Sequence, residues 1–133
     1  MRGSTKRGRR GFTLIELVIV ISMILVLLSI ALPMYNRSIL RAKEATLHHN
    51  LVTLNKAIQE YSANKNKAPL APEDLVPEYI KFIPDDITGS NTWQTDNEDP
   101  QDAWDPNQTG IKSVHSGSNE VSSDGRPYSA WDH

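Results

Sequence analysis

The chain has 133 residues, and an apolar stretch near its start takes up about 21 of them, which leaves about 100 for a soluble part and excludes a large enzyme. The absence of cysteine excludes a disulfide framework, a thiol nucleophile and a cysteine-based zinc site. The formal charge of -2 hides an asymmetry, because five bases and no acid lie in the first ten residues, whereas the chain from Pro69 onward has three bases against 13 acids. Phosphate binding needs clustered cations, so the acidic part favours a cationic partner over nucleic acid.

The apolar stretch covers residues 12–32, and its residues that are not apolar are Thr13, Glu16, Ser22 and Ser29. As a helix it would be about 31 Å long, enough to cross the hydrocarbon core of a bilayer. The bases before it and the acids after it predict that residues 1–10 are cytoplasmic and that the chain beyond Pro33 lies outside. An ordinary signal anchor fits this pattern, and so does a secretory signal cleaved after the small residues Ser29 and Ala31.

Neither interpretation explains Glu16, because an ionised carboxylate in a lipid-spanning helix costs a few kcal/mol unless it finds a partner. A cut between Gly11 and Phe12 would create that partner, since the new α-amino group of Phe12 is cationic at neutral pH. If helices stack with an axial stagger, Glu16 of one copy can neutralise Phe12 of its neighbour. The pair would then set the register of an assembly.

Residues 9–17, which read Arg-Arg-Gly-Phe-Thr-Leu-Ile-Glu-Leu, resemble the processing signal of type IV pilin-like proteins. The resemblance implies that a prepilin peptidase removes residues 1–11 and N-methylates Phe12. Pro33 matches the helix-perturbing proline of that family. It lacks an N–H and weakens the helix one turn earlier, so it is interpreted as a flexible joint in a continuous spine or as a marker of the membrane boundary.

The residues after Pro33 predict a second, half-buried helical segment from Tyr35 to about Asn64. The apolar face comprises Leu40, Leu47, Leu51, Leu54, Ile58 and Tyr61. The opposite, polar face comprises Arg37, Arg41, Lys43, Glu44, His48, Lys56 and Glu60. His48 and His49 point about 100° apart and are expected to be surface side chains rather than metal ligands.

The remainder predicts short elements joined by loops. Pro72 followed by two acids opens a short helical turn, and an apolar cap follows, made of Leu75, Val76, Tyr79, Ile80, Phe82 and Ile83. Residues 88–110 should form loops apart from a short strand at Asn91–Thr95. The acids at 96, 98, 99, 102 and 105 have no matching base there, and a solvated loop is expected. A strand around Ile111 and Val114 precedes a return segment from Gly125 to Trp131.

Two stretches, 83–89 and 114–118, resemble the major pseudopilin of type II secretion, as does Asp124-Gly125 in the polar loop that follows. In that family the terminal loop binds calcium, and the matching positions are Ser116 and Asp124, with Val114 as a carbonyl donor. This chain departs from the pattern. Where the family has a second carboxylate before the final tryptophan, residues 127–129 supply none, and the cation Arg126 is close by.

The expected fold is therefore α+β and pilin-like, with a long N-terminal helix whose first half is transmembrane, packed on a small antiparallel sheet with long loops. The expected segments are a leader (1–11), a transmembrane and assembly segment (12–33), the exported half of the spine (34–66) and a C-terminal region (67–133). Glu16 and Pro33 are the residues expected to act in assembly.

The expected function is that of a non-enzymatic, pseudopilin-type subunit of a type II secretion filament in the bacterial inner membrane, with its C-terminal domain in the periplasm. The expected partners are further copies, other pseudopilins, prepilin peptidase, membrane lipid and an assembly platform with a cytoplasmic ATPase, but not nucleic acid. A surface pilin for adhesion, motility or DNA uptake is an alternative. A monomeric membrane-anchored module that binds an ion or ligand is another.

Overall fold

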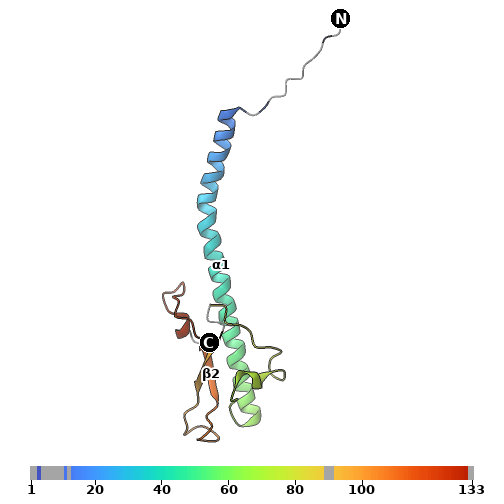
Figure 1. Cartoon of the computed structure of the whole chain (residues 1–133), viewed down its shortest axis with the longest axis vertical. Coiled ribbons are helices and arrows are strands. Elements are labelled where there is room, and N and C mark those ends of the chain that lie inside the picture. Colours follow the sequence, from blue (N-terminus) through green and yellow to red (C-terminus); the bar gives the residue numbers. More distant parts are fainter. Residues whose placement is uncertain (1–2, 4–10, 12, 89–91, 132–133) are drawn as a thin grey trace. The chain divides into compact units, whose positions relative to one another are not determined.

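The computed structural model describes residues 3, 11, 13–88 and 92–131. Its elements in chain order are the helix α1 (Leu14–Lys65), the 3-10 helix η1 (Pro72–Leu75), the strands β1 (Trp93–Asn97) and β2 (Ile111–Ser116), and the 3-10 helix η2 (Tyr128–Ala130) (Figure 1). A long apolar N-terminal helix with a small antiparallel sheet confirms the expected α+β, pilin-like layout. The chain divides into two compact units, one that ends at Ser38 and one that begins at Ile39.

The first unit is the apolar part of α1. Thr13 precedes the helix, and its Oγ1 accepts a hydrogen bond from the backbone N–H of Glu16 at 3.3 Å, which satisfies one of the free donors at a helix start. The apolar side chains here are exposed, from 45% at Leu28 to 80% at Leu14. By length and composition, α1 is a helix that could cross a membrane. A helix satisfies its own backbone groups, which lipid requires.

The second unit packs the later turns of α1 on the sheet and the loops. One cluster joins the helix to η1 and β2 and consists of Leu54, Ala57, Ile58, Tyr61, Leu75, Ile111 and Val114. A second cluster joins Leu47 and Leu51 to Tyr128 of η2. The predicted helix face is therefore buried from Leu47 onward, whereas Leu40 is 37% exposed, contrary to expectation.

The sheet has two antiparallel strands, β1 and β2, with Trp93 opposite Ser116 and Thr95 opposite Val114. The pairing shifts between Asp96 and Asn97, where the ladder is irregular. The first strand therefore begins and ends two residues later than predicted. The return segment contains the short helix η2, and its Pro127 forms an isolated bridge with Val121.

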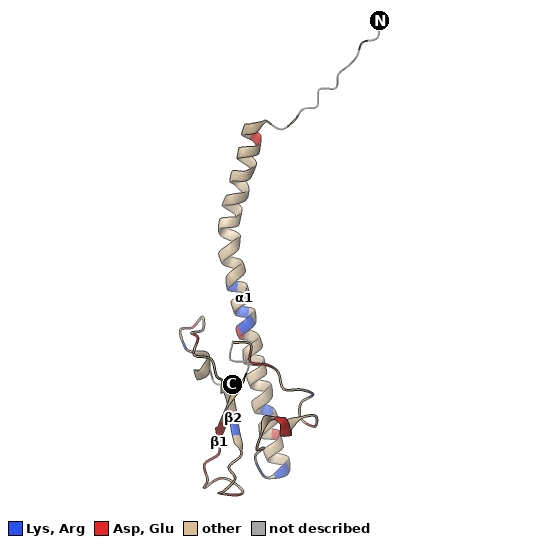
Figure 2. Ribbon diagram, in the orientation of Figure 1, with Lys and Arg blue, Asp and Glu red and all other residues tan. Residues whose placement is uncertain are grey.

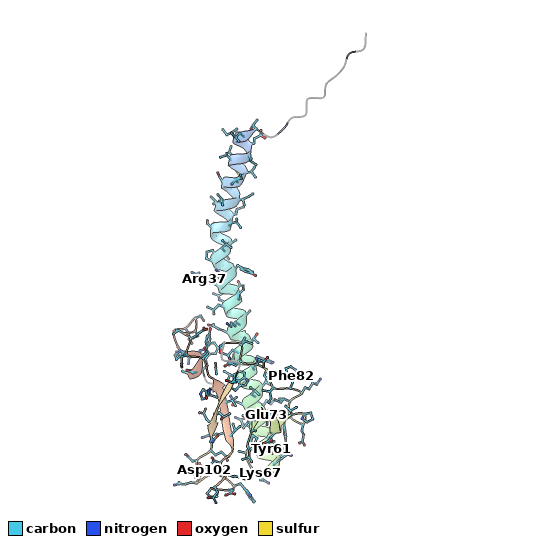
Figure 3. The ribbon with its side chains drawn as sticks, in the orientation of Figure 1. Arg37, Tyr61, Lys67, Glu73, Phe82 and Asp102 are labelled. Atoms are coloured by element: carbon cyan, nitrogen blue, oxygen red, sulfur yellow. The ribbon has the colours of Figure 1, made fainter. Side chains whose placement is uncertain are left out.

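Three side chains correct the sequence-based expectations. Glu44, expected on the polar face of α1, is only 8% exposed. Phe82, expected in the apolar cap, is 71% exposed and points away from the helix (Figure 3). Asp96, expected in a solvated loop without a matching base, lies in β1, and its Oδ2 is 2.9 Å from Nδ1 of His115. The predicted helical turn at Pro72 is confirmed as η1.

Candidate assembly segment and terminal loop

The start of α1 carries the predicted processing and assembly residues. Gly11 is described and exposed, whereas Phe12, the predicted site of cleavage and methylation, lies outside the described residues. Glu16 follows in the first turn of the helix and is exposed. Helix starts favour negative charge, so the carboxylate suits this position before any partner binds. Its pairing with Phe12 of a neighbour stays a prediction.

Pro33 lies inside α1, which continues without a break to Lys65. A proline has no N–H and cannot donate to the carbonyl one turn earlier, that of Ser29. The Ser29 hydroxyl donates to the carbonyl of Val26 at 2.6 Å in the same stretch. Pro33 therefore does not end the helix, and its role as a joint in assembly stays a prediction.

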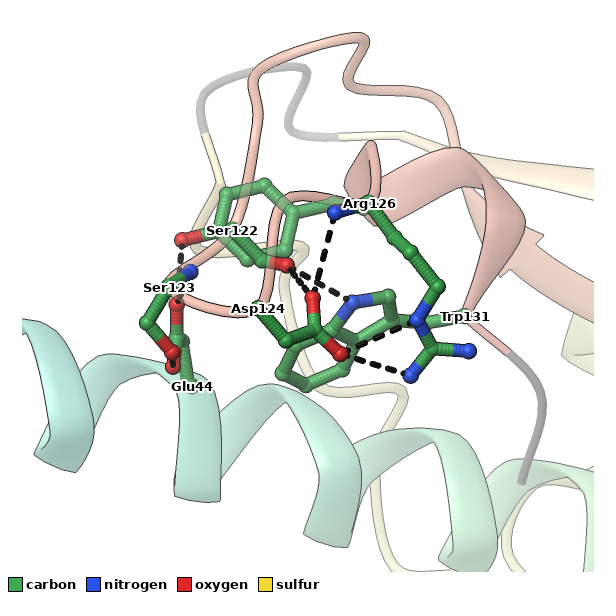
Figure 4. A network of polar contacts seen from close by, with 7 residues as sticks. Glu44, Ser122, Ser123, Asp124, Arg126 and Trp131 are labelled. Carbon is green, nitrogen blue, oxygen red and sulfur yellow. Dashed lines mark hydrogen bonds and ion pairs between the residues drawn. The ribbon is translucent and has the colours of Figure 1, made fainter.

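Glu44 holds the terminal loop against α1 (Figure 4). Its Oε1 accepts hydrogen bonds from the backbone N–H of Ser123 at 2.7 Å and from the hydroxyl of Tyr128 at 3.2 Å, and its Oε2 accepts one from the Ser123 hydroxyl at 2.6 Å. Burial raises the pKa of Glu44, but the hydrogen bonds from Ser123 and Tyr128 outweigh it and leave the pKa below 4.5. Burial, with the Glu44 hydrogen bond, raises the pKa of Tyr128. The carboxylate thus stays ionised at neutral pH. It joins Glu44 to Ser123, which is 79 positions later in the chain, and to Tyr128, which is 84 positions later.

Asp124 lies in the same loop and is neutralised by Arg126. Its Oδ2 accepts from Nε at 3.0 Å and from Nη2 at 2.8 Å, and its Oδ1 accepts from the Ser122 hydroxyl. The hydrogen bond from Ser122 and those from Arg126 lower the pKa of Asp124 from 3.8 to about 2. The indole of Trp131 donates to Ser122 at 3.3 Å and closes this network.

The other two predicted calcium ligands contact different groups. The Ser116 hydroxyl lies at the end of β2, where it donates to Oδ2 of the buried Asp86 at 2.7 Å and contacts the Thr88 hydroxyl at 2.7 Å. The backbone of Val114 is bound by Asn55 of α1, whose Oδ1 accepts from the N–H at 2.8 Å and whose Nδ2 donates to the carbonyl at 3.2 Å.

These contacts do not fit a calcium site. Calcium takes six to eight oxygen ligands, several of them carboxylates. The carbonyl of Val114 accepts a hydrogen bond from Asn55, and the hydroxyl of Ser116 donates one to Asp86. Asp124 accepts from the guanidinium of Arg126. Within residues 13–88 and 92–131 no three histidine or acidic side chains gather in a way that could hold a metal ion. Calcium binding thus stays a prediction from the resemblance, and the donor set here gives it no support.

The sequence interpretation missed three buried polar residues that organise the second unit: Glu44, Asn55 and Asp86. Two of them carried a usable signal. Glu44 lies three residues before Leu47 and seven before Leu51, and Asn55 lies four after Leu51, so helical periodicity places both on the buried face. Asp86 follows Asp85 in a loop, where no periodicity distinguishes the buried acid from the exposed one.

Comparison with known proteins bears on the N-terminal part alone. A family model described as the prokaryotic N-terminal methylation motif matches residues 6–32, which include Gly11, Phe12 and Glu16. No curated protein and no solved structure matches the chain. The motif indicates a prepilin-type substrate of prepilin peptidase, and it points toward the structural subunits of the pilin and pseudopilin class.

Proposed function

We propose that this protein is a pseudopilin, a subunit of a pilus-like filament of a type II secretion system. The observation that carries the proposal is the methylation motif at residues 6–32, joined directly to a helix that could cross a membrane. Such a chain is held in the bilayer until it is extracted into a polymer. The pairing of Glu16 with the methylated amine of Phe12 on a neighbouring copy supplies the register.

The proposed topology follows from charge. The basic leader stays in the cytoplasm, and the acidic second unit lies in the periplasm. Prepilin peptidase removes residues 1–11, and an inner-membrane platform driven by a cytoplasmic ATPase adds the subunit to the filament beside other pseudopilins. Pro33 provides the joint that lets the helix adapt on leaving the bilayer.

Two features favour the secretion filament over a surface fibre. The chain has no cysteine and so cannot close a C-terminal loop by a disulfide, and stretches 83–89 and 114–118 resemble the major pseudopilin. A type IV pilin remains the alternative use of the same assembly signal. Deleting the gene separates the two, because loss of secreted protein supports the pseudopilin and loss of surface fibres supports the pilin.

The first test is the intact mass of the protein extracted from native membranes. Cleavage after Gly11 and one methyl group on Phe12 are expected. A chain that begins at Met1 would support an ordinary signal anchor, and one that begins at Leu32 would support a secretory signal. Either result would contradict the proposal.

The second test is Glu16→Ala, with Glu60→Ala as a matched control on the exported part of α1. The first variant should insert into the membrane and be processed but yield no sedimentable polymer, because the register-setting charge is lost. Glu60→Ala should assemble as the parent does, since its carboxylate forms an exposed ion pair with Lys56, at 3.9 Å, and such surface pairs contribute little. A Glu16→Ala protein that forms polymer as the parent does would contradict the register role of Glu16. A parent that forms no polymer, with a Glu16→Ala variant of unchanged localisation and activity, would support the monomeric module.

A further inference from the structure

α1 and the terminal loop border a groove of about 470 Å³ in the second unit. It is lined by Arg41, Glu44, Ala45, His48, Asp124, Arg126 and Trp131. Both carboxylates of the groove are already used inside the molecule, Glu44 by Ser123 and Tyr128 and Asp124 by Ser122 and Arg126 (Figure 4). The groove therefore offers donors, not acceptors, to an incoming group.

Arg41 and the outer edge of Arg126 can bind an acceptor from outside. Arg41 is exposed and forms no ion pair with any residue that the structure describes. Arg126 directs Nε and Nη2 at Asp124 and is 60% exposed in its side chain, so its outer edge faces solvent. Arginine binds carboxylates bidentately, so the groove is suited to an acidic side chain.

The opposite end of the second unit carries the complementary charge. The loop that joins β1 to β2 contains Glu98, Asp99, Asp102 and Asp105 and no base (Figure 2). None of these four acids makes an ion pair within the described part of the chain. Lys67 borders the cavity beside this loop, but the acids there outnumber this single base, so the net charge of the neighbourhood is negative.

The cations of α1 near that acidic end are engaged within the subunit. Lys56 contacts Glu60 at 3.9 Å, and Lys65 contacts Glu78 at 3.4 Å, which raises the pKa of Lys65. The groove, which includes Arg41, and the acidic loop, which borders a cavity with Tyr61 and Lys67, therefore lie at different levels of the second unit. Arg41 and Lys65 are separated by about 36 Å along the axis at 1.5 Å per residue.

We infer that the groove at Arg41 and Arg126 receives the acidic loop, residues 98–105, of a second copy of this chain. The two patches are different surfaces at different levels of the second unit. A copy that docks its loop in a neighbour's groove leaves its own groove open for a third, so the contact is heterologous and extends into a filament. The inference rests on the proposed function and specifies which surfaces of the exported domains meet.

The absence of cysteine allows a direct test with the full chain in native membranes, because every cross-link must come from introduced residues. Arg41→Cys combined with Asp102→Cys should give a ladder of dimers, trimers and larger species with a thiol-specific cross-linker. Lys81→Cys combined with Asp102→Cys is the matched control and should give no ladder, because Lys81 is exposed and lies outside the groove.

Charge reversal provides the second arm. Arg41→Glu should lower the sedimentable polymer about tenfold, since facing like charges oppose binding. Adding Asp99→Lys and Asp102→Lys should restore the sedimentable polymer to within about twofold of the parent's, because the charges are then exchanged between the two patches. Lys81→Glu makes the same charge change elsewhere and should assemble as the parent does. Tryptophan emission checks that each variant is folded.

The outcomes separate this interface from the proposed function. A 41–102 ladder with loss and rescue of polymer supports the inference. If the parent assembles but the 41–102 pair forms no ladder, or Arg41→Glu is not rescued or has no effect, the interface is wrong and the filament function stands. If the processed parent remains single copies while its machinery is active, both are overturned.

Discussion

Replacing Glu44 by alanine should destabilise the second unit more than any other single change at an acidic residue of α1. The carboxylate is 8% exposed and accepts three hydrogen bonds from the terminal loop. Hydrogen bonds to a charged group contribute about 1.5–3 kcal/mol each, but water can replace the carboxylate at the exposed Ser123. The hydroxyl of Tyr128, a residue 3% exposed, would lose its partner in the interior.

The expected loss for Glu44→Ala is about 3 kcal/mol of unfolding free energy, dominated by the orphaned hydroxyl and the released loop. For a unit of about 95 residues this lowers the melting temperature by about 12 °C or more. Glu44→Gln keeps one acceptor oxygen but turns an amide N–H₂ toward the Ser123 donors, and should cost about 1–2 kcal/mol.

The assay is thermal unfolding of the full chain in detergent micelles, followed by tryptophan emission. Trp131 is a suitable reporter because its ring contacts Tyr128, with 5.4 Å between centroids. Glu60→Ala is the control, since its exposed pair with Lys56 should contribute less than about 0.5 kcal/mol.

The effect should depend on pH in one direction. The folded-state pKa of Glu44 lies below the ordinary value of 4.5, so its stabilisation is fully present above pH 4.5 and is lost as the pH falls through the folded-state pKa. The stability difference between the parent and Glu44→Gln should be constant from about pH 5 to 7 and shrink below it. Equal melting temperatures for Glu44→Ala and Glu60→Ala, or a difference that grows on acidification, would refute this account.

Four further predictions concern the second unit. Asn55→Ala should cost about 2–4 kcal/mol in denaturant unfolding, because the buried N–H and carbonyl of Val114 lose their partner. Gly110→Ala should cost about 1–3 kcal/mol in the same assay, since its new Cβ would lie 2.5 Å from the Cβ of Ala68 and 2.8 Å from the carbonyl oxygen of Ala68. Carboxyl NMR should show Asp124 titrating at about 2, with a higher midpoint in Arg126→Ala, which loses the second largest cause of the shift after Ser122. The ionised carboxylate of Asp124 therefore stabilises the fold above pH 3.8, and this stabilisation is lost as the pH falls through about 2. Chelation of calcium should leave the melting temperature unchanged, because Asp124 is already paired with Arg126; a drop of several degrees would restore the calcium site expected from the resemblance.

The helix and its buried face were predictable because apolar periodicity is a local signal. Leu47, Leu51, Leu54 and Ile58 follow a regular three-and-four spacing, and all four are at most 2% exposed. Leu40 extends the same spacing but is 37% exposed, and it belongs to neither buried cluster of the described residues. Periodicity shows which face is apolar but not where the covering layer ends.

The terminal loop was not predictable in the same way, because its contacts join distant positions. Glu44 looked like one more charged residue among Arg41, Lys43 and His48, and only the folded chain shows Ser123 and Tyr128 beside it. Asp96 lies on β1 opposite Ser113, next to His115, and that pairing depends on the strand register. Loop residues without periodicity carry no signal for either contact.

Among the described residues, Tyr128 comes after every other buried apolar side chain in chain order, and it packs on Leu47 and Leu51 near the start of the second unit. If the second unit is exported early part first, as proposed, it cannot complete this cluster until Tyr128 has arrived. Until then the two leucines remain accessible to proteases and chaperones. Under the proposed export, completion of this cluster would mark the arrival of Tyr128, and a chain cut short before it would stay open to degradation.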